Sequence, residues 1–137
     1  MTDMHFIKGA TLAGTSGRSQ DVFNPATGAV VGTVPLASTG EVDAAIAAAK
    51  AALPGWANTP PAKRAQVMFK FRDLIIRDLD KLAGLISAQH GKTLDDARGE
   101  VARGLEVVEF ACGIPHLLKG EYSAQVANAV DSYSLRQ

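Results

Sequence analysis

The first third of the chain alternates short apolar runs with turn-forming residues, a pattern typical of strands rather than helices. A short run at His5–Ile7 comes first. Segment 24–28 then has the sequence Asn-Pro-Ala-Thr-Gly, in which proline sets φ at a turn position and glycine permits the positive φ that closes a turn. Val22 and Phe23 precede this segment, and β-branched residues follow it as far as Pro35. The pattern therefore predicts a hairpin.

Apolar residues next recur at three- and four-residue steps, which predicts helices. The first helix is expected over residues 39–53, because Ser38 and Glu41 have the spacing of a capping box and Pro54 should end it. The second is expected over 61–90 as a pair of helices or one kinked helix, with a break near Asp78.

The third helix is expected over residues 94–112. Thr93 is a capping residue at its start, and Gly113 follows its end. Its apolar stripe consists of Leu94, Ala97, Val101, Leu105, Val108 and Cys112. Beyond it, Tyr133 and Leu135 alternate with polar residues, which predicts a strand within 124–137 with one apolar face.

Composition narrows the possible partners. The chain has 137 residues, with 14 Lys+Arg balancing 14 Asp+Glu. This balance argues against nucleic-acid and anionic-membrane partners, because both require surplus positive charge. Hydrophobic residues make up 47% of the chain, which predicts a folded domain with a core. There is no apolar run long enough to span a membrane and no leader-like start, and the single cysteine excludes an internal disulfide, so we expect a cytoplasmic protein.

Most candidate chemical motifs are weak. Gly91-Lys92-Thr93 ends like a phosphate-binding loop, but Ile86 stands where that motif needs its first glycine. No G-x-G-x-x-G dinucleotide fingerprint is present, and no His or Cys spacing indicates a metal site. Cys112 and His116 are four residues apart, yet glycine and proline interrupt the helix between them, so a buried packing thiol is the favoured interpretation.

Arg103 is the one residue with two strong interpretations. It lies on the predicted helix 94–112, three residues after Glu100 and three before Glu106, a spacing that suits surface ion pairs. Alternatively, its guanidinium is an anion clamp, because its planar fork matches a carboxylate. Spacing alone favours the surface ion pair.

Several segments together resemble the start of the aldehyde dehydrogenase superfamily, from about Phe6 onward. They are Asn24–Gly28 with Val30–Pro35, Val42 to Trp56, Arg64 through Gly91-Lys92, and Ala97–Val101. The helix sequence Gly99–Pro115, continued by His116–Glu121, resembles the methylmalonate-semialdehyde dehydrogenase subfamily in particular. In that subfamily the arginine at the position of Arg103 is implicated in binding the substrate carboxylate. The resemblance therefore favours the anion clamp over the surface ion pair as the interpretation of Arg103.

The resemblance also implies a fold and a reaction. The complete chain would have the α/β aldehyde dehydrogenase architecture. Residues 1–137 would form the N-terminal part of the NAD-binding domain, with an oligomerisation strand at about 124–137 and no catalytic domain. The intact enzyme would be a cytoplasmic tetramer or dimer of valine catabolism. It would use NAD and coenzyme A to convert methylmalonate or malonate semialdehyde into propionyl-CoA or acetyl-CoA and CO2.

The catalytic cysteine, the glutamate, the oxyanion-hole asparagine, the NAD contacts and a second carboxylate-binding arginine of the family are not expected within this sequence. We therefore expect the segment alone to be inactive, with no catalytic residue of its own, and we expect its uncovered apolar helix faces to promote association. Two alternatives remain. One is a non-acylating aldehyde dehydrogenase, in which water hydrolyses the thioester, and the other is a non-catalytic helical scaffold or assembly module.

Overall fold

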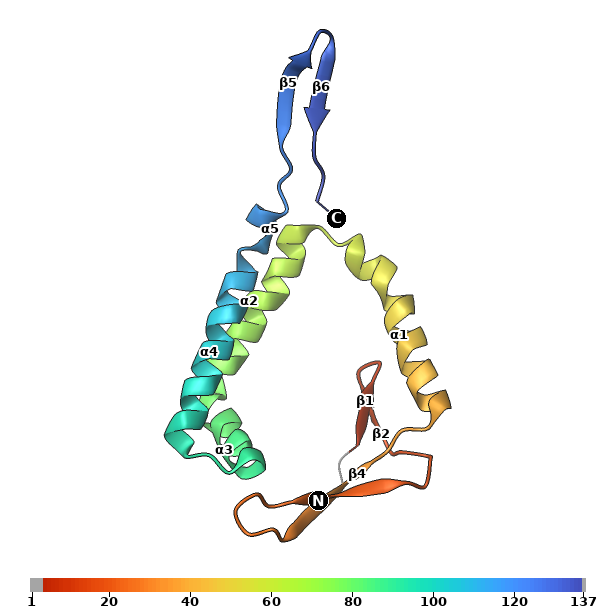
Figure 1. Ribbon diagram of the computed structural model, residues 1–137, viewed down its shortest axis with the longest axis vertical. Coiled ribbons are helices and arrows are strands. Elements are labelled where there is room, and N and C mark those ends of the chain that lie inside the picture. The colour runs from red at the N-terminus through yellow and green to blue at the C-terminus, as the bar shows by residue number, and fades with distance from the viewer. Residues whose placement is uncertain (1–3, 137) are drawn as a thin grey trace.

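The computed structural model describes residues 4–136 as an open arrangement of helices and two-stranded antiparallel hairpins (Figure 1). The elements are β1 (His5–Ile7), β2 (Ala10–Leu12), β3 (Ser19–Phe23), β4 (Val30–Pro35), α1 (Thr39–Ala57), α2 (Pro61–Arg77), α3 (Leu79–His90), α4 (Leu94–Cys112), α5 (Ile114–Leu117), β5 (Tyr122–Ala127) and β6 (Val130–Tyr133). Helix α1 stands on one side and α2 with α4 on the other, while β5 and β6 project from the end opposite the N-terminal hairpins.

The predicted N-terminal hairpin is confirmed. Strands β3 and β4 pair antiparallel, with Val22 opposite Gly32. In the turn, the Asn24 side-chain oxygen accepts hydrogen bonds from the amides of Ala26 and Thr27 at 2.9 and 3.1 Å. Gly28 has a φ of 72°, the left-handed value that the turn required. Local turn chemistry therefore accounts for the position at which this hairpin turns.

Helix α1 begins as predicted but ends later. The capping box is present, with the Ser38 amide donating to Glu41 Oε2 at 2.7 Å and the Glu41 amide donating to Ser38 Oγ at 3.3 Å. The expected stop at Pro54 is wrong, because the helix continues to Ala57. Pro54 cannot donate a helical hydrogen bond of its own, but its carbonyl still accepts one from the Asn58 amide at 3.1 Å.

The Glu41 cap should respond to acid. Hydrogen bonds from the Ser38 amide, the Ser38 hydroxyl and the Thr15 amide lower the pKa of Glu41 from 4.5 to about 2. A depressed carboxyl pKa stabilises the fold fully above pH 4.5, and this contribution is lost as the pH falls through about 2. An NMR titration of the Glu41 carboxyl should therefore give a midpoint near 2. In a Ser38→Ala variant the midpoint should rise, and an unperturbed midpoint in the original chain would contradict the capping box.

The remaining helices agree with their predicted bounds. The expected break lies at Asp78, where φ is −103° and ψ is 16°, and it divides 61–90 into α2 and α3. Gly91 ends α3 in the left-handed conformation. At the start of α4, Thr93 Oγ1 accepts a hydrogen bond from the Asp96 amide at 3.3 Å. Capping and periodicity, which are local properties, account for these boundaries.

The C-terminal segment differs from the prediction of one strand within 124–137. Residues 122–133 form a hairpin instead, and Leu135 lies beyond the end of β6. The chain turns at Asn128 and Ala129, and Ala129 adopts a φ of 57°. This turn lacks the glycine that normally marks such a conformation, so the sequence pattern concealed it. Gln137 is outside the described residues.

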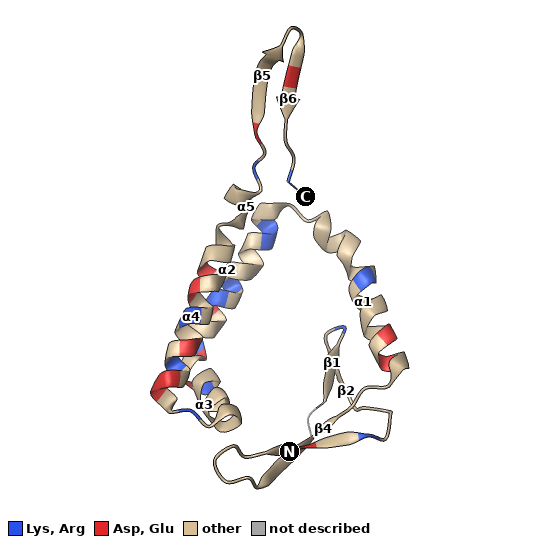
Figure 2. Cartoon of the chain, in the orientation of Figure 1, with Lys and Arg blue, Asp and Glu red and all other residues tan. Residues whose placement is uncertain are grey.

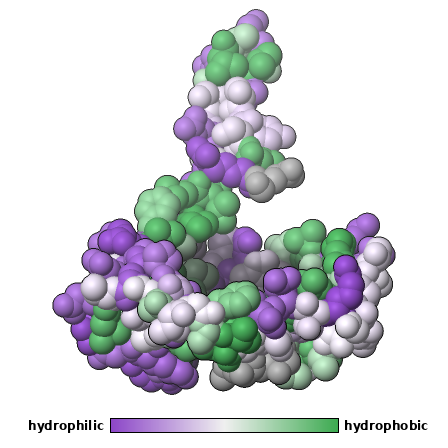
Figure 3. Space-filling model, turned by 60° about the horizontal axis from the view of Figure 1, so that its bottom comes forward, coloured by the Kyte–Doolittle hydropathy of each residue, from purple (hydrophilic) through white to green (hydrophobic). Residues whose placement is uncertain are grey.

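The buried core is small. Ala83, Ala97 and Val101 form its centre, and Ile75, Leu79, Leu82 and Ile86 pack against them. The accessible surface is 10331 Å², whereas a compact monomer of this mass would expose about 6,800 Å². Figure 3 shows apolar residues exposed on both the helical body and the projecting hairpin. The chain therefore leaves much of its apolar surface uncovered. Within residues 4–136, no helix has the length and apolarity needed to cross a membrane.

Candidate functional site

Helix α4 carries Arg103 and is held by contacts to both α2 and α3. Ala97 and Val101 point into the small core against α3. Towards the other end of α4, Glu109 accepts a hydrogen bond from Arg72 Nε of α2 at 2.8 Å. Charged residues gather on these helices and are sparse on the strands (Figure 2). These contacts fix the face that α4 turns inward, and so also the face on which Arg103 lies.

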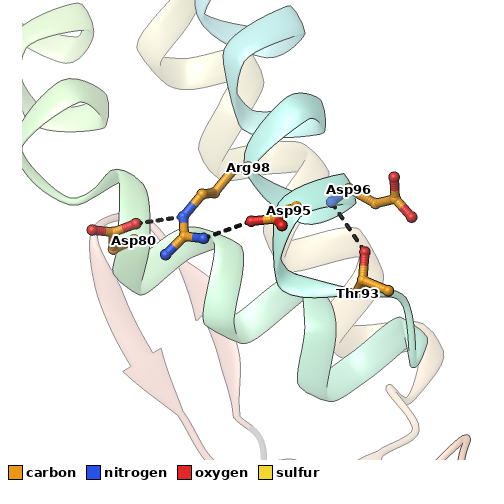
Figure 4. A network of polar contacts seen from close by, with 5 residues as sticks. All are labelled: Asp80, Thr93, Asp95, Asp96 and Arg98. Carbon is orange, nitrogen blue, oxygen red and sulfur yellow. Dashed lines mark hydrogen bonds and ion pairs between the residues drawn. The ribbon is translucent and has the colours of Figure 1, made fainter.

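A polar network anchors the first turn of α4 to α3. Arg98 donates from Nε to Asp80 at 2.8 Å and from Nη1 to Asp95 at 2.9 Å (Figure 4). The Thr93 cap lies beside it, and Asp95 and Asp96 supply negative charge at the positive end of the helix dipole. The pKa of the Arg98 guanidinium is raised by its hydrogen bond to Asp80 first and to Asp95 second. Arg98 is therefore a structural arginine.

Arg103 is bound far less tightly than Arg98. Its side chain is 69% exposed, and its Nη2 atom lies 3.9 Å from Glu100 Oε1, which is beyond hydrogen-bond distance. The ion pair predicted from the spacing to Glu100 is thus present only as a loose contact. The guanidinium keeps its donors available for another anion. Its role in substrate binding remains a prediction.

The surroundings of Arg103 include an apolar stripe that sequence reasoning missed. Val107 and Phe110 follow it by four and seven residues, spacings that place all three on one face of α4. Val107 and Phe110 are both 68% exposed. The predicted stripe through Ala97 and Val101 faces the core, so this second stripe remains uncovered. The signal was available in the three- and four-residue spacing from Arg103.

Glu100 is engaged by a second cation. Lys92 Nζ forms a close ion pair with Glu100 Oε1, the same oxygen that faces Arg103. The Lys92 side chain is only 15% exposed, and its carbonyl accepts a hydrogen bond from Ser87 Oγ at 2.7 Å. The hydrogen bond from Lys92 is the main cause that lowers the pKa of Glu100, followed by the charges of Lys92 and Arg103. The Gly91-Lys92 sequence therefore engages a carboxylate of its own chain.

Cys112 is buried, at 8% exposure, as predicted for a packing thiol. It ends α4, whereas His116 lies in the separate helix α5. Among residues 4–136, no group of three or more His, Cys, Asp or Glu side chains is arranged to hold a metal ion. The described side chains thus place a solvent-exposed arginine, Arg103, beside the exposed apolar residues Val107 and Phe110.

Comparison with known proteins places these features in a family. The profile described as the aldehyde dehydrogenase family matches residues 12–137. The chain is 48% identical over 134 residues to a malonate-semialdehyde dehydrogenase of Pseudomonas aeruginosa, covering 98% of this chain and 27% of that protein. It is 49% identical over 133 residues to the mitochondrial acylating methylmalonate-semialdehyde dehydrogenase of Arabidopsis thaliana, covering 97% and 22%. The chain therefore spans about a quarter of the length of these relatives.

Solved structures share the arrangement as well. A provisionally named methylmalonate-semialdehyde dehydrogenase of Sinorhizobium meliloti, solved with NAD, superposes with a TM-score of 0.94 at 51% identity, covering 100% of this chain and 28% of that one. The corresponding enzyme of Oceanimonas doudoroffii gives a TM-score of 0.91 at 51% identity, covering 98% and 28%. The predicted fold class is thus confirmed, and the chain belongs to the aldehyde dehydrogenase family.

Proposed function

We propose that this chain is the N-terminal part of an NAD-dependent, coenzyme A-acylating semialdehyde dehydrogenase. Its substrate would be methylmalonate or malonate semialdehyde, and its products propionyl-CoA or acetyl-CoA with CO2. The relatives named above support this substrate class. The structural observation that carries it is the exposed Arg103 beside Val107 and Phe110, because a small aliphatic acid needs a cation next to an apolar wall.

In this proposal the chain contributes substrate binding rather than bond making. The nucleophile would be a cysteine thiolate outside this sequence, since Cys112 is buried at the end of α4. That thiolate would add to the aldehyde carbon, and loss of hydride would leave a thioester. Carbon–carbon cleavage would release CO2, and a proton would take its place on the acyl group. Transfer of the acyl group to the coenzyme A thiol would then restore the enzyme thiolate.

NAD, when bound, would accept the hydride. The residues of this chain show no dinucleotide fingerprint, so we assign none of them to the nucleotide. The assignment of residues 1–137 to the NAD-binding domain remains part of the proposal. Arg103 would orient the substrate by its carboxylate, leaving the aldehyde end directed towards the nucleophile.

The intact protein is further proposed to work as a cytoplasmic tetramer or dimer. The projecting β5–β6 hairpin supports assembly, because an isolated two-stranded hairpin with every residue exposed gains stability by pairing or packing with another surface. Family membership disfavours the alternative of a non-catalytic scaffold. The non-acylating alternative differs in its final acyl acceptor, which product analysis distinguishes.

The test is a product analysis with the intact protein. Methylmalonate semialdehyde and NAD should give propionyl-CoA when coenzyme A is present, with NADH formed in equal amount. A control without coenzyme A should lose the thioester product. Free propionate formed at the same rate with and without coenzyme A would indicate the non-acylating alternative, and absence of NADH formation would reject the dehydrogenase itself.

A further inference from the structure

Two cations, Lys92 in the loop before α4 and Arg103 on α4, lie near the same carboxylate oxygen of Glu100. Lys92 Nζ is in close contact with Glu100 Oε1, whereas Arg103 Nη2 lies 3.9 Å from that same atom. A helix alone would favour the Glu100–Arg103 pair, because residues three apart are neighbours on its surface. In the structure, Glu100 pairs closely with Lys92 instead of with Arg103.

Burial explains why Lys92 holds the carboxylate. Its side chain is 15% exposed, so an unpaired ammonium there would lose most of its hydration without compensation. The Arg103 side chain is 69% exposed and remains solvated without a partner. The Lys92 backbone is also fixed, between the left-handed cap at Gly91 and the hydrogen bond from Ser87 Oγ to its carbonyl. A fixed, desolvated cation is the stronger partner for Glu100.

We infer that Lys92 is a positioning residue that keeps the Arg103 guanidinium available by holding Glu100 away from it. This inference rests on the proposed function, in which Arg103 receives the substrate carboxylate. Without Lys92, an ionised Glu100 would remain three residues from Arg103 on the same helix. It would then form the intrahelical pair and compete with the substrate for the guanidinium donors. Lys92 thereby acts on substrate affinity indirectly, through its ion pair with Glu100.

The experiment uses the intact enzyme and the ratio of KM for the carboxylated semialdehyde to KM for propanal. Lys92→Met should raise this ratio by roughly 2- to 5-fold, the magnitude of an exposed ion pair. Lys92→Met/Glu100→Gln should restore the ratio, because the competing carboxylate is gone. Arg98→Gln is the matched control, since it removes the two ion pairs that Arg98 of α4 makes with Asp80 and Asp95 and should leave the ratio unchanged.

The single variant Glu100→Gln distinguishes release of Arg103 by Lys92 from a long-range effect of charge on substrate binding. If Lys92 already holds Glu100, that substitution should change the ratio little. If instead each charge acted on the substrate only through its electrostatic field, Glu100→Gln would lower the KM ratio by as much as Lys92→Met raises it. This result would overturn the inference.

The inference and the proposed function fail in different ways. If Arg103→Leu affects both aldehydes equally, the substrate role of Arg103 is wrong. If Arg103→Leu discriminates between them but Lys92→Met leaves the ratio unchanged, or the double variant does not restore it, only the positioning role of Lys92 is wrong. Retained kcat on propanal in each variant shows that the enzyme is folded.

Discussion

Replacing Arg103 with leucine in the intact enzyme should lower kcat/KM for the carboxylated semialdehyde by roughly 10- to 100-fold. The reason is the loss of a charge-assisted hydrogen bond, which contributes about 1.5–3 kcal/mol to binding. Leucine keeps a side chain on α4 beside Val107 and Phe110, so the apolar face remains while the charge is removed. Steady-state kinetics with methylmalonate semialdehyde provide the measurement.

Propanal is the control substrate, because it has an aldehyde but no carboxylate. Its kcat/KM should change by less than about threefold, since leucine removes no interaction that propanal makes. Arg98→Leu provides a matched protein control, since Arg98 lies on the same helix but is bound to Asp80 and Asp95. Equal losses on both aldehydes in the Arg103 variant would assign that arginine a structural role.

The second large effect concerns the 137-residue chain by itself, which should self-associate rather than behave as a compact monomer. Its buried residues are few, and the exposed apolar residues include Trp56, Phe71, Val107 and Phe110. Helix α1 has no buried residue along its whole length. Exposed apolar faces of this extent drive association, because burial against another surface is worth about 25 cal/mol per Å².

Size-exclusion chromatography with light scattering should therefore show species heavier than the 14.3 kDa chain. The fraction of the protein in these species should increase with protein concentration. Val107→Ser/Phe110→Ser should reduce this association, and Gly104→Ser, which changes an open position on the same helix, should not. A concentration-independent monomer with a sharp cooperative melt would contradict the prediction. It would mean that the chain completes its own core.

Local chemistry determined much of the fold that could be predicted. The Asn24–Gly28 turn, the Ser38–Glu41 box, the break at Asp78 and the Thr93 cap each depend on residues a few positions apart. Prediction failed where a local rule was incomplete. Pro54 removed one donor without ending α1, and the turn at Asn128 and Ala129 formed without glycine. In both cases the backbone tolerates a conformation that residue preference disfavours.

In the candidate site, too, some features follow from the sequence and others only from the tertiary structure. The sequence by itself determined that Arg103 lies on a helix, three residues from Glu100, and that its surrounding motif resembles a semialdehyde dehydrogenase. Only the tertiary structure decided that Glu100 pairs with Lys92, and that Val107 and Phe110 stay uncovered beside Arg103. Helical spacing identifies possible neighbours, but the choice among them depends on which charge is desolvated, and burial is a property of the packed chain.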